Sequence, residues 1–246
     1  MQIFYETDVG LIRRNNQDYC LCGKISDTLA WAAVCDGMGG ANGGNIASLE
    51  ACKEIERILK KELEKLSGND DESLKALMKK AVADANAKVF KMSCENEELE
   101  GMGTTVELVV ISGDTLHVVH AGDSRVYRIS GEKIFQVTTD HSLVQQLVDL
   151  GQITQEEARF HPSKNYITRA LGVEEELETD YLTAPFESGD IILICTDGLS
   201  NYFSSDELLA AVHSFKDKEE LAQGLVEIAK DCGGSDNITV AVLIKE

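Results

Sequence analysis

The sequence predicts an α+β fold in which two antiparallel sheets pack face to face and a pair of helices covers each outer face. Two observations predict this four-layer α-β-β-α sandwich. Helical patterns occur in pairs between groups of strands, whereas a doubly wound parallel sheet alternates single helices with single strands. Strand-like segments in the middle of the chain also follow one another through tight, glycine-containing turns, which join antiparallel strands but cannot join parallel neighbours.

The first strands and the first helical pair are predicted in the N-terminal part of the chain. Residues 1–8 alternate like a strand, and residues 19–25 and 28–36 are expected to form a hairpin. Apolar residues at helical spacing then predict helices at 45–66 and 71–92. Each of these helices would bury one apolar stripe against a sheet.

The chain then returns to strands. Residues 104–139 are predicted to form an antiparallel meander of strands. Residues 140–171 interrupt the strands with two short helical patterns. The remaining segments are predicted, in order, as two strands, a second helical pair and a last strand: 177–184, 190–197, 204–215, 217–232 and 237–245.

Composition limits the class of protein. No Pro/Ser-rich linker, low-complexity block or internal repeat divides the 246 residues, so one domain spanning 1–246 is expected. The N-terminus does not resemble a signal peptide, and no apolar run approaches the roughly 18 residues of a membrane span. The net charge of -20 disfavours nucleic acid and anionic membranes as partners. We therefore expect a cytoplasmic protein.

The cysteines are predicted to be reduced. Their number, seven, is odd, they form no CxxC pair, and several lie in apolar strand-like runs. This pattern is typical of buried thiols in a cytosolic protein. Neither cysteine nor histidine falls at zinc-site spacing.

Five aspartates mark the ends of predicted strands. Asp36 and Asp197 follow apolar runs, Asp18 and Asp236 precede them, and Asp123 lies in the turn of "HAGDSR". In antiparallel pairing, the end of one strand lies beside the start of its neighbour. Strands of opposite direction could therefore bring four of these carboxylates to one rim of the sandwich, and Asp123 would arrive on a hairpin.

Such a cluster would require protons or cations. Two unit charges about 4 Å apart repel by roughly 4 kcal/mol at an effective dielectric constant near 20. Ligands that are all oxygen atoms favour Mg²⁺ or Mn²⁺ over zinc. The glycines of "CDGMGG", Gly37 and Gly39 among them, would let backbone and solvent approach a bound ion closely. The alternative is five unrelated turn aspartates.

Eight motifs in register carry a resemblance to a known family. They are "RRNNQD", "CDGMGG", "GMGTTV", "HAGDSRVYR", "TTDHSLVQQLVDLGQIT", "HPSKNYITRALG", "TDGLSN" and "SDNITV". The chain resembles the metal-dependent PP2C-type (PPM) serine/threonine protein phosphatases, specifically the small bacterial members. The resemblance runs nearly end to end. Within it, the segment 140–171 resembles the family's flap beside the site, and the alternative is a simple connecting insert.

The resemblance implies a binuclear Mn²⁺ or Mg²⁺ centre. Asp36 would bridge both ions and the Gly37 carbonyl would bind the first. Asp197 and Asp236 would bind the second ion, and Asp18 would hold a metal-bound water. A water that bridges the ions would attack phosphoserine or phosphothreonine directly, without a covalent phosphoenzyme.

The resemblance also implies roles for two further residues. Arg13 would bind the substrate phosphate, a task suited to a planar guanidinium, whereas Arg14 beside it would not. Asp123 would hold a third ion together with Asp197. The implied partners are phosphorylated proteins and a Hanks-type Ser/Thr kinase that acts on the same targets. We expect a monomer.

The chain departs from the family pattern at two positions. Met38 stands where some members have a histidine that protonates the leaving alkoxide, so a metal-bound water, His141 or His161 would have to do so. Both histidines could equally be structural hydrogen-bonding groups. Gln17 stands where some relatives have a metal-contacting Glu. An inactive phosphoprotein-binding module on the same fold and a structural cation site remain as alternatives.

Overall fold

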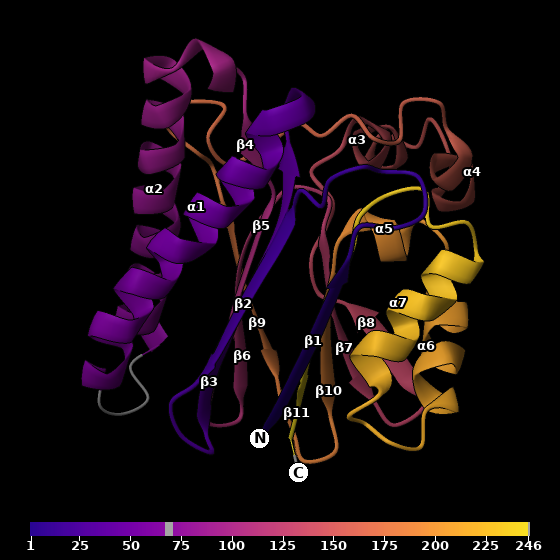
Figure 1. Ribbon diagram of the computed structural model, residues 1–246. Coiled ribbons are helices and arrows are strands. Elements are labelled where there is room, and N and C mark those ends of the chain that lie inside the picture. The colour runs from indigo at the N-terminus through magenta and orange to yellow at the C-terminus, as the bar shows by residue number, and fades with distance from the viewer. Residues whose placement is uncertain (67–70, 246) are drawn as a thin grey trace.

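Two antiparallel sheets form the centre of the protein in a computed structural model that describes residues 1–66 and 71–245 (Figure 1). The first sheet has the order β1 (Gln2–Asp8), β11 (Ile238–Ile244), β10 (Ile191–Cys195), β7 (Arg125–Ser130) and β8 (Lys133–Gln136). The second has the order β2 (Asp18–Lys24), β3 (Leu29–Met38), β5 (Val106–Ser112), β6 (Thr115–Ala121) and β9 (Asp180–Pro185). A short strand, β4 (Gly103–Thr104), extends the pairing of β3.

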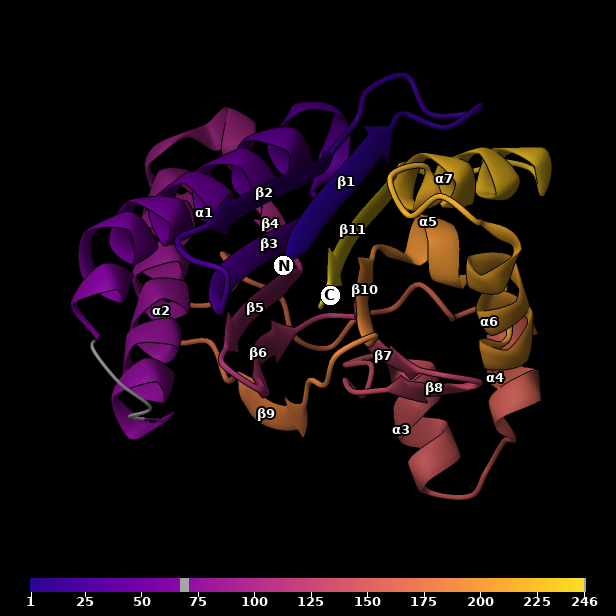
Figure 2. The same cartoon turned by 90° about the horizontal axis from the view of Figure 1, so that it is seen from below.

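Each sheet is covered on its outer face by a pair of helices, so the predicted four-layer fold is confirmed (Figures 1 and 2). Helices α1 (Gly40–Glu62) and α2 (Asp71–Glu95) cover the second sheet. Helices α6 (Ser205–Ser214) and α7 (Leu221–Asp231) cover the first. Two 3₁₀ turns, η1 (Leu63–Lys65) and η2 (Glu97–Leu99), follow α1 and α2.

The apolar run in β3 shows why these layers form. Successive side chains of a strand point to opposite faces. Ala33 and Cys35 therefore pack under α1 and α2, whereas Ala32 and Val34 face the other sheet. A strand buried on both faces has no polar alternation, which explains the continuous run "LAWAAVC". The seven cysteines are free, as predicted.

The predicted meander is wrong. Strands β5 and β6 pair in the second sheet, whereas β7 and β8 pair in the first. The connection at residues 122–124 therefore passes from one sheet to the other, and β6 takes β9 as its second neighbour while β7 takes β10. Gly122 in this connection has φ 128°, a left-handed conformation that favours glycine. Asp123 thus arrives on a crossing between sheets and not on a hairpin.

Strand β3 is also longer than predicted. It continues to Met38 because Gly37 and Met38 pair with Thr104 and Gly103 of β4. Asp36 is therefore a strand residue and does not follow the strand end.

The segment 140–171 contains α3 (Leu143–Asp149) and α4 (Gln155–Phe160). The Ser142 hydroxyl caps α3 by accepting from the Gln145 amide, and Thr154 and Glu157 form a capping box on α4. The segment lies at the end of the sandwich where β3 finishes (Figure 1). In the part of the chain that the structure describes, no helix is both long and apolar enough to cross a membrane.

Candidate active site

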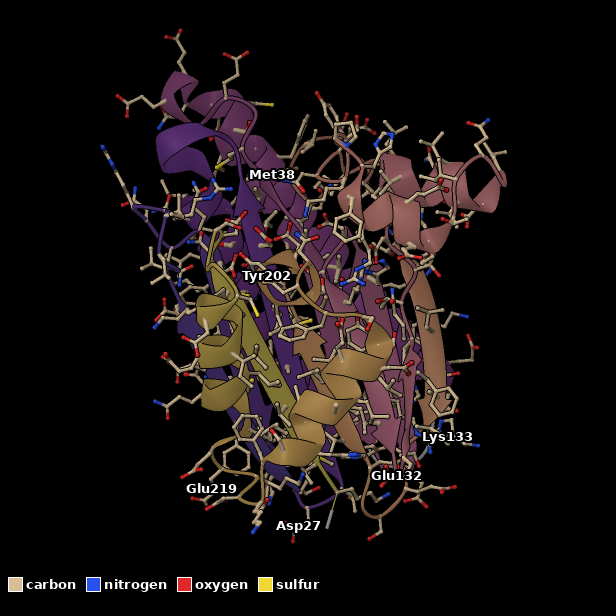
Figure 3. The ribbon with its side chains drawn as sticks, turned by 90° about the vertical axis from the view of Figure 1, so that its right-hand side faces the viewer. Asp27, Met38, Glu132, Lys133, Tyr202 and Glu219 are labelled. Atoms are coloured by element: carbon tan, nitrogen blue, oxygen red, sulfur yellow. The ribbon has the colours of Figure 1, made fainter. Side chains whose placement is uncertain are left out.

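A cavity of about 520 Å³ opens at this end of the sandwich. All but one of the predicted site residues line it: Arg13, Asp36, Gly37, Asp123, Asp197 and Asp236. Met38 lines it too, and Figure 3 shows this residue at the end that carries α3 and α4. The remaining residue, Asp18, is 5% exposed and is not part of the lining. The structure therefore brings the predicted aspartates to one place and buries Asp18.

Strand register places Asp18 beside Asp36. The two are cross-strand partners in the antiparallel pair of β2 and β3. The backbone of Asp36 is further held by the two threonines of "GMGTTV". Its amide donates to the Thr105 hydroxyl over 2.9 Å, and its carbonyl accepts from the Thr104 hydroxyl and the Thr105 amide over 2.8 Å each. The backbone of Asp36 is thus held on both sides, by its pairing with β2 and by its bonds with the two threonines.

Asp18 carries an orphaned oxygen. Its Oδ2 accepts from the Thr196 hydroxyl over 2.9 Å. Its Oδ1 is buried and has no hydrogen-bond partner among the described residues. Leaving a buried acceptor unsatisfied is costly, so this oxygen indicates a place for a water or a cation.

The other two rim aspartates lie just outside strands of the first sheet. Asp197 is the first residue of α5 (Asp197–Ser200), a single turn that the sequence did not predict, and its Oδ2 accepts from the Asn201 side chain over 2.9 Å. Asp236 precedes β11. Its Oδ2 accepts from Nη2 of Arg13 over 2.7 Å, and the Arg13 side chain is 50% exposed.

Asn237 positions the loop that carries Arg13, and sequence reasoning missed it. Its Nδ2 donates to the carbonyls of Val9 and Asn15, and its Oδ1 accepts from the Gln17 amide. The buried Asn237 therefore bonds to both ends of the Arg13 loop. The available signal was an amide side chain directly after Asp236 in "SDN".

The aspartates raise one another's pKa values. Burial raises the pKa of Asp36 well above its usual range, and the carboxylates of Asp18 and Asp197 raise it further. Burial also raises the pKa of Asp18 to about 7, against hydrogen bonds from Thr239 and Thr196 that lower it. The pKa of Asp197 rises to about 6, mainly through burial and then through Asp236. Burial and Asp197 raise the pKa of Asp123. Raised pKa values are expected where several carboxylates lie close together, and a bound cation would offset their repulsion.

The donor set fits hard cations that keep part of their water shell. Within the described residues, no group of three or more Asp, Glu, His or Cys side chains is placed to hold a metal ion by itself. Mg²⁺ is usually bound through one or two carboxylates and keeps several waters. Asp36, Asp197 and Asp236 around one polar cavity, with the orphaned oxygen of Asp18 behind them, match that mode of binding.

The glycines of "CDGMGG" allow close packing. A Cβ on Gly37 would lie 2.1 Å from the Gly44 carbonyl oxygen and 2.5 Å from that of Gln17. Gly39 has φ 115°, and a Cβ there would lie 2.7 Å from the Cα of Met102. The glycines let the start of α1 approach β3 closely, a constraint that the sequence interpretation did not include.

Neither histidine proposed as a proton donor lines the cavity. His141 is held by three contacts: its Nδ1 accepts from the Gly122 amide, and its Nε2 lies 3.0 Å from Nη1 of Arg169 and 3.3 Å from Oδ2 of Asp180. Burial, the stacked His120 ring and Arg169 lower the pKa of His141. His161 ends α4, and its Nδ1 accepts from the Ser163 amide. Both geometries favour the structural alternative.

Comparisons with known proteins identify the family of this chain. The family model described as protein phosphatase 2C matches residues 13–229, and the chain belongs to this family. It is 38% identical to the protein phosphatase PhpP of Streptococcus pneumoniae over 245 residues, which cover 99% of this chain and 97% of the relative.

Solved phosphatase structures are also similar to this chain. The serine/threonine phosphatase of S. agalactiae superposes with a TM-score of 0.90 at 33% identity, covering 100% of this chain and 99% of that one. The catalytic domain of the serine/threonine protein phosphatase PstP, solved with two manganese ions, gives a TM-score of 0.85 at 35% identity, with 98% and 96% covered.

Proposed function

We propose that the protein is a metal-dependent phosphatase that hydrolyses phosphoserine and phosphothreonine in proteins. The observation that carries the proposal is the single cavity lined by Arg13 and four aspartates, with Asp18 buried beneath. Family membership supports it, because similar proteins are named protein phosphatase and serine/threonine phosphatase. The acidic surface makes a local positive centre necessary for a phosphorylated substrate.

The site residues would hold two Mn²⁺ or Mg²⁺ ions. Asp36, the Gly37 carbonyl, Asp197 and Asp236 are the proposed ligands, and Asp18 would hold a water. When bound, such ions would supply a nucleophilic water at neutral pH and would offset negative charge on the phosphoryl oxygens. Asp123 and Asp197 would hold a third ion.

Arg13 would orient the substrate, and the residues that line the cavity limit which group can protonate the leaving alkoxide. Arg13 donates to Asp236 through Nη2, so its other guanidinium nitrogens can donate to the phosphate without breaking that contact. Met38 cannot donate a proton, and neither His141 nor His161 lines the cavity. The leaving serine or threonine alkoxide would therefore take its proton from water. Asn165 and Ile167 of the segment 140–171 also line the cavity, which supports its role as a flap in a single-domain enzyme.

The cellular setting belongs to the same proposal. The seven free thiols favour a reducing compartment such as the cytoplasm. There the protein would act as a monomer on phosphoproteins made by a Hanks-type kinase.

The test is turnover of p-nitrophenyl phosphate and a phosphoserine peptide by the purified chain. We expect both to be hydrolysed with Mn²⁺ and neither in EDTA. An inactive phosphoprotein-binding module or a structural cation site would give no turnover under any condition. Full activity after exhaustive dialysis against EDTA would refute the metal-dependent mechanism.

A further inference from the structure

A second cavity adjoins the catalytic cavity. Its volume is about 300 Å³, and it shares Met38 and Ile167 with the first. The rest of its lining comes from residues 168–178, which lead from the end of the flap toward β9. We call this second cavity the side groove. Because the two cavities share walls, a polypeptide that places its phosphorylated residue in the first can run directly into the second.

Part of the lining of the side groove is apolar. Met38, Ile167, Val173 and Leu177 line it. Val173 is 46% exposed although its side chain is apolar. A Cβ on Gly103 would lie 2.7 Å from Val173 Cγ2 and 2.9 Å from Met38 Cε, so these two side chains flank β4 at a position where a larger residue would collide with them.

The wall of the side groove is acidic and uncompensated. Glu174 and Glu176 are exposed, and neither forms an ion pair with a described residue. Arg169, the one cation in the lining among the described residues, already contacts His141, Asp180 and Glu178 at 3.0 to 3.2 Å. The groove therefore presents free carboxylates and no free cation.

A buried amide fixes the acidic wall in place. Asn86 of α2 is 2% exposed. Its Oδ1 accepts from the Gly172 amide over 2.7 Å, and its Nδ2 donates to the carbonyls of Glu174 and Glu175 over 3.0 Å each. Backbone bonds between Thr104 and Leu171 join the same segment to β4. A wall that is already ordered loses little conformational entropy when it binds a ligand.

We propose that the side groove binds the substrate segment next to the phosphorylated residue and selects lysine or arginine there. The inference rests on the proposed function and names its substrate class. A groove lined by both apolar side chains and carboxylates matches a side chain with an aliphatic stem and a cationic head. A cavity of about 300 Å³ is at the small end of ligand pockets, so it suits one or two side chains. An extended chain advances about 3.3 Å per residue, so a residue a few positions away can reach it.

The experiment measures kcat/KM for matched phosphoserine peptides that differ only in one flanking position. Lysine, glutamine or glutamate is placed in turn at each of the four positions on either side of phosphoserine. We expect the wild-type enzyme to prefer lysine over glutamate by about tenfold at one or two positions, mainly through KM, since each exposed pair is worth up to about fivefold. The double variant Glu174→Gln/Glu176→Gln should reduce this preference to about threefold or less.

A matched control separates the groove from the overall negative field. Glu132 and Glu219 lie at the end of the molecule opposite Met38 (Figure 3). The double variant Glu132→Gln/Glu219→Gln removes the same charge, and its lysine preference should equal that of the wild type. The charge reversal Glu176→Lys should shift the preference toward glutamate.

The outcomes are distinguishable. An unchanged lysine preference in the Glu174→Gln/Glu176→Gln variant, or an equal loss in the control variant, would overturn the inference. Turnover of p-nitrophenyl phosphate, which has no flanking residues, should be the same in all these proteins. If it is hydrolysed while flanking charge has no effect, the groove inference alone is wrong. If neither p-nitrophenyl phosphate nor any peptide is hydrolysed, the proposed function fails with it.

Discussion

In the sheet that contains β2 and β3, both site aspartates are strand residues, whereas in the sheet that contains β10 and β11 they lie just outside the strands. Asp18 and Asp36 face each other in a strand register, and three bonds from Thr104 and Thr105 hold the backbone of Asp36. The carboxylates of Asp197 and Asp236 accept from the side chains of Asn201 and Arg13, and that of Asp236 also accepts from the Asn237 amide.

The site therefore has two halves, the aspartates on β2 and β3 and those beside β10 and β11, which we expect to differ in how readily they change partners. A ladder of backbone hydrogen bonds cannot rearrange without breaking the sheet, so the β2–β3 half fixes where ions would bind. Side-chain contacts of a half-exposed arginine exchange at little cost. The β10–β11 half is therefore the part expected to change partners when phosphate enters.

The largest effect is expected from Asp36→Asn, in the fixed half. Asparagine keeps the strand register and the backbone contacts with Thr104 and Thr105, so the thermal midpoint should change little. Turnover should fall by about a thousandfold or more, because metal polarisation supplies several kcal/mol of transition-state stabilisation. Phosphopeptide kinetics measure turnover, circular dichroism measures the thermal midpoint, and titration calorimetry measures Mn²⁺ binding. A variant that folds, binds Mn²⁺ normally and stays active would show that Asp36 is not part of the metal site.

A smaller loss is expected from Arg13→Ala, in the exchangeable half. Loss of a charge-assisted hydrogen bond costs about 1.5–3 kcal/mol, so kcat/KM should fall about tenfold to a hundredfold. A rise in KM would mean that Arg13 binds phosphate in the ground state, and a fall in kcat that it meets charge developing in the transition state.

Arg14→Ala is the matched control for Arg13. Arg14 also lines the cavity, but it forms no ion pair with any described residue. Its removal should change kcat/KM by less than about threefold, the scale of an exposed charge. Equal damage from both substitutions would show that the phosphate contact was assigned to the wrong arginine.

Only part of the fold and of the site could be predicted from the sequence. Helix and strand periods identified the main elements, and apolar runs that end in aspartate identified the rim. The meander failed because a short Gly-containing turn can join two strands of one sheet or cross between sheets, and only tertiary packing at 122–124 decides. Helix α5 is one turn long, too short to have a period. The role of Asn237 depends on contacts with residues more than 200 positions away, which no local pattern encodes.

A more selective loss is expected from Asp123→Ala, on the crossing between the two sheets. The turn is held by bonds that do not involve the Asp123 carboxylate: the Gly122 amide donates to His141, and Ser124 contacts the Thr105 hydroxyl. The thermal midpoint should therefore be nearly unchanged. Turnover of a phosphoserine peptide should fall about tenfold, less than the roughly hundredfold or more that a positioned proton donor supplies, because bulk water can still protonate the leaving group.

The same variant should retain more activity toward p-nitrophenyl phosphate, whose leaving group needs little protonation. Parallel kinetics on the two substrates, with Mn²⁺ stoichiometry, measure the difference. Equal losses on both substrates together with a lower thermal midpoint would assign Asp123 to the turn and not to a third ion.

The smallest effect, a few degrees in thermal midpoint, is expected from Asp18→Asn without metal. Burial raises the pKa of Asp18 in the folded protein to about 7 from an ordinary value near 3.8. The folded state therefore binds this proton more tightly than the unfolded state, and stability falls as pH rises between about 4 and 7. Asparagine carries no charge, so in EDTA at pH 8 the variant should melt above the wild type, and the gap should close near pH 4.

Thermal melts of both proteins across this pH range isolate the contribution of one carboxyl, because the remaining surface charge is common to both. Excess Mn²⁺ should reverse the order at pH 8, since bound cations stabilise the folded wild type by mass action and the variant lacks the Asp18 carboxylate. The position of Asp18 in the β2–β3 half explains why we expect this reversal. Asp18 is locked in the β2–β3 register and cannot turn toward solvent to escape its buried charge. A variant that melts below the wild type in EDTA at pH 8 would show that the Thr196 hydrogen bond outweighs the cost of burying the carboxylate.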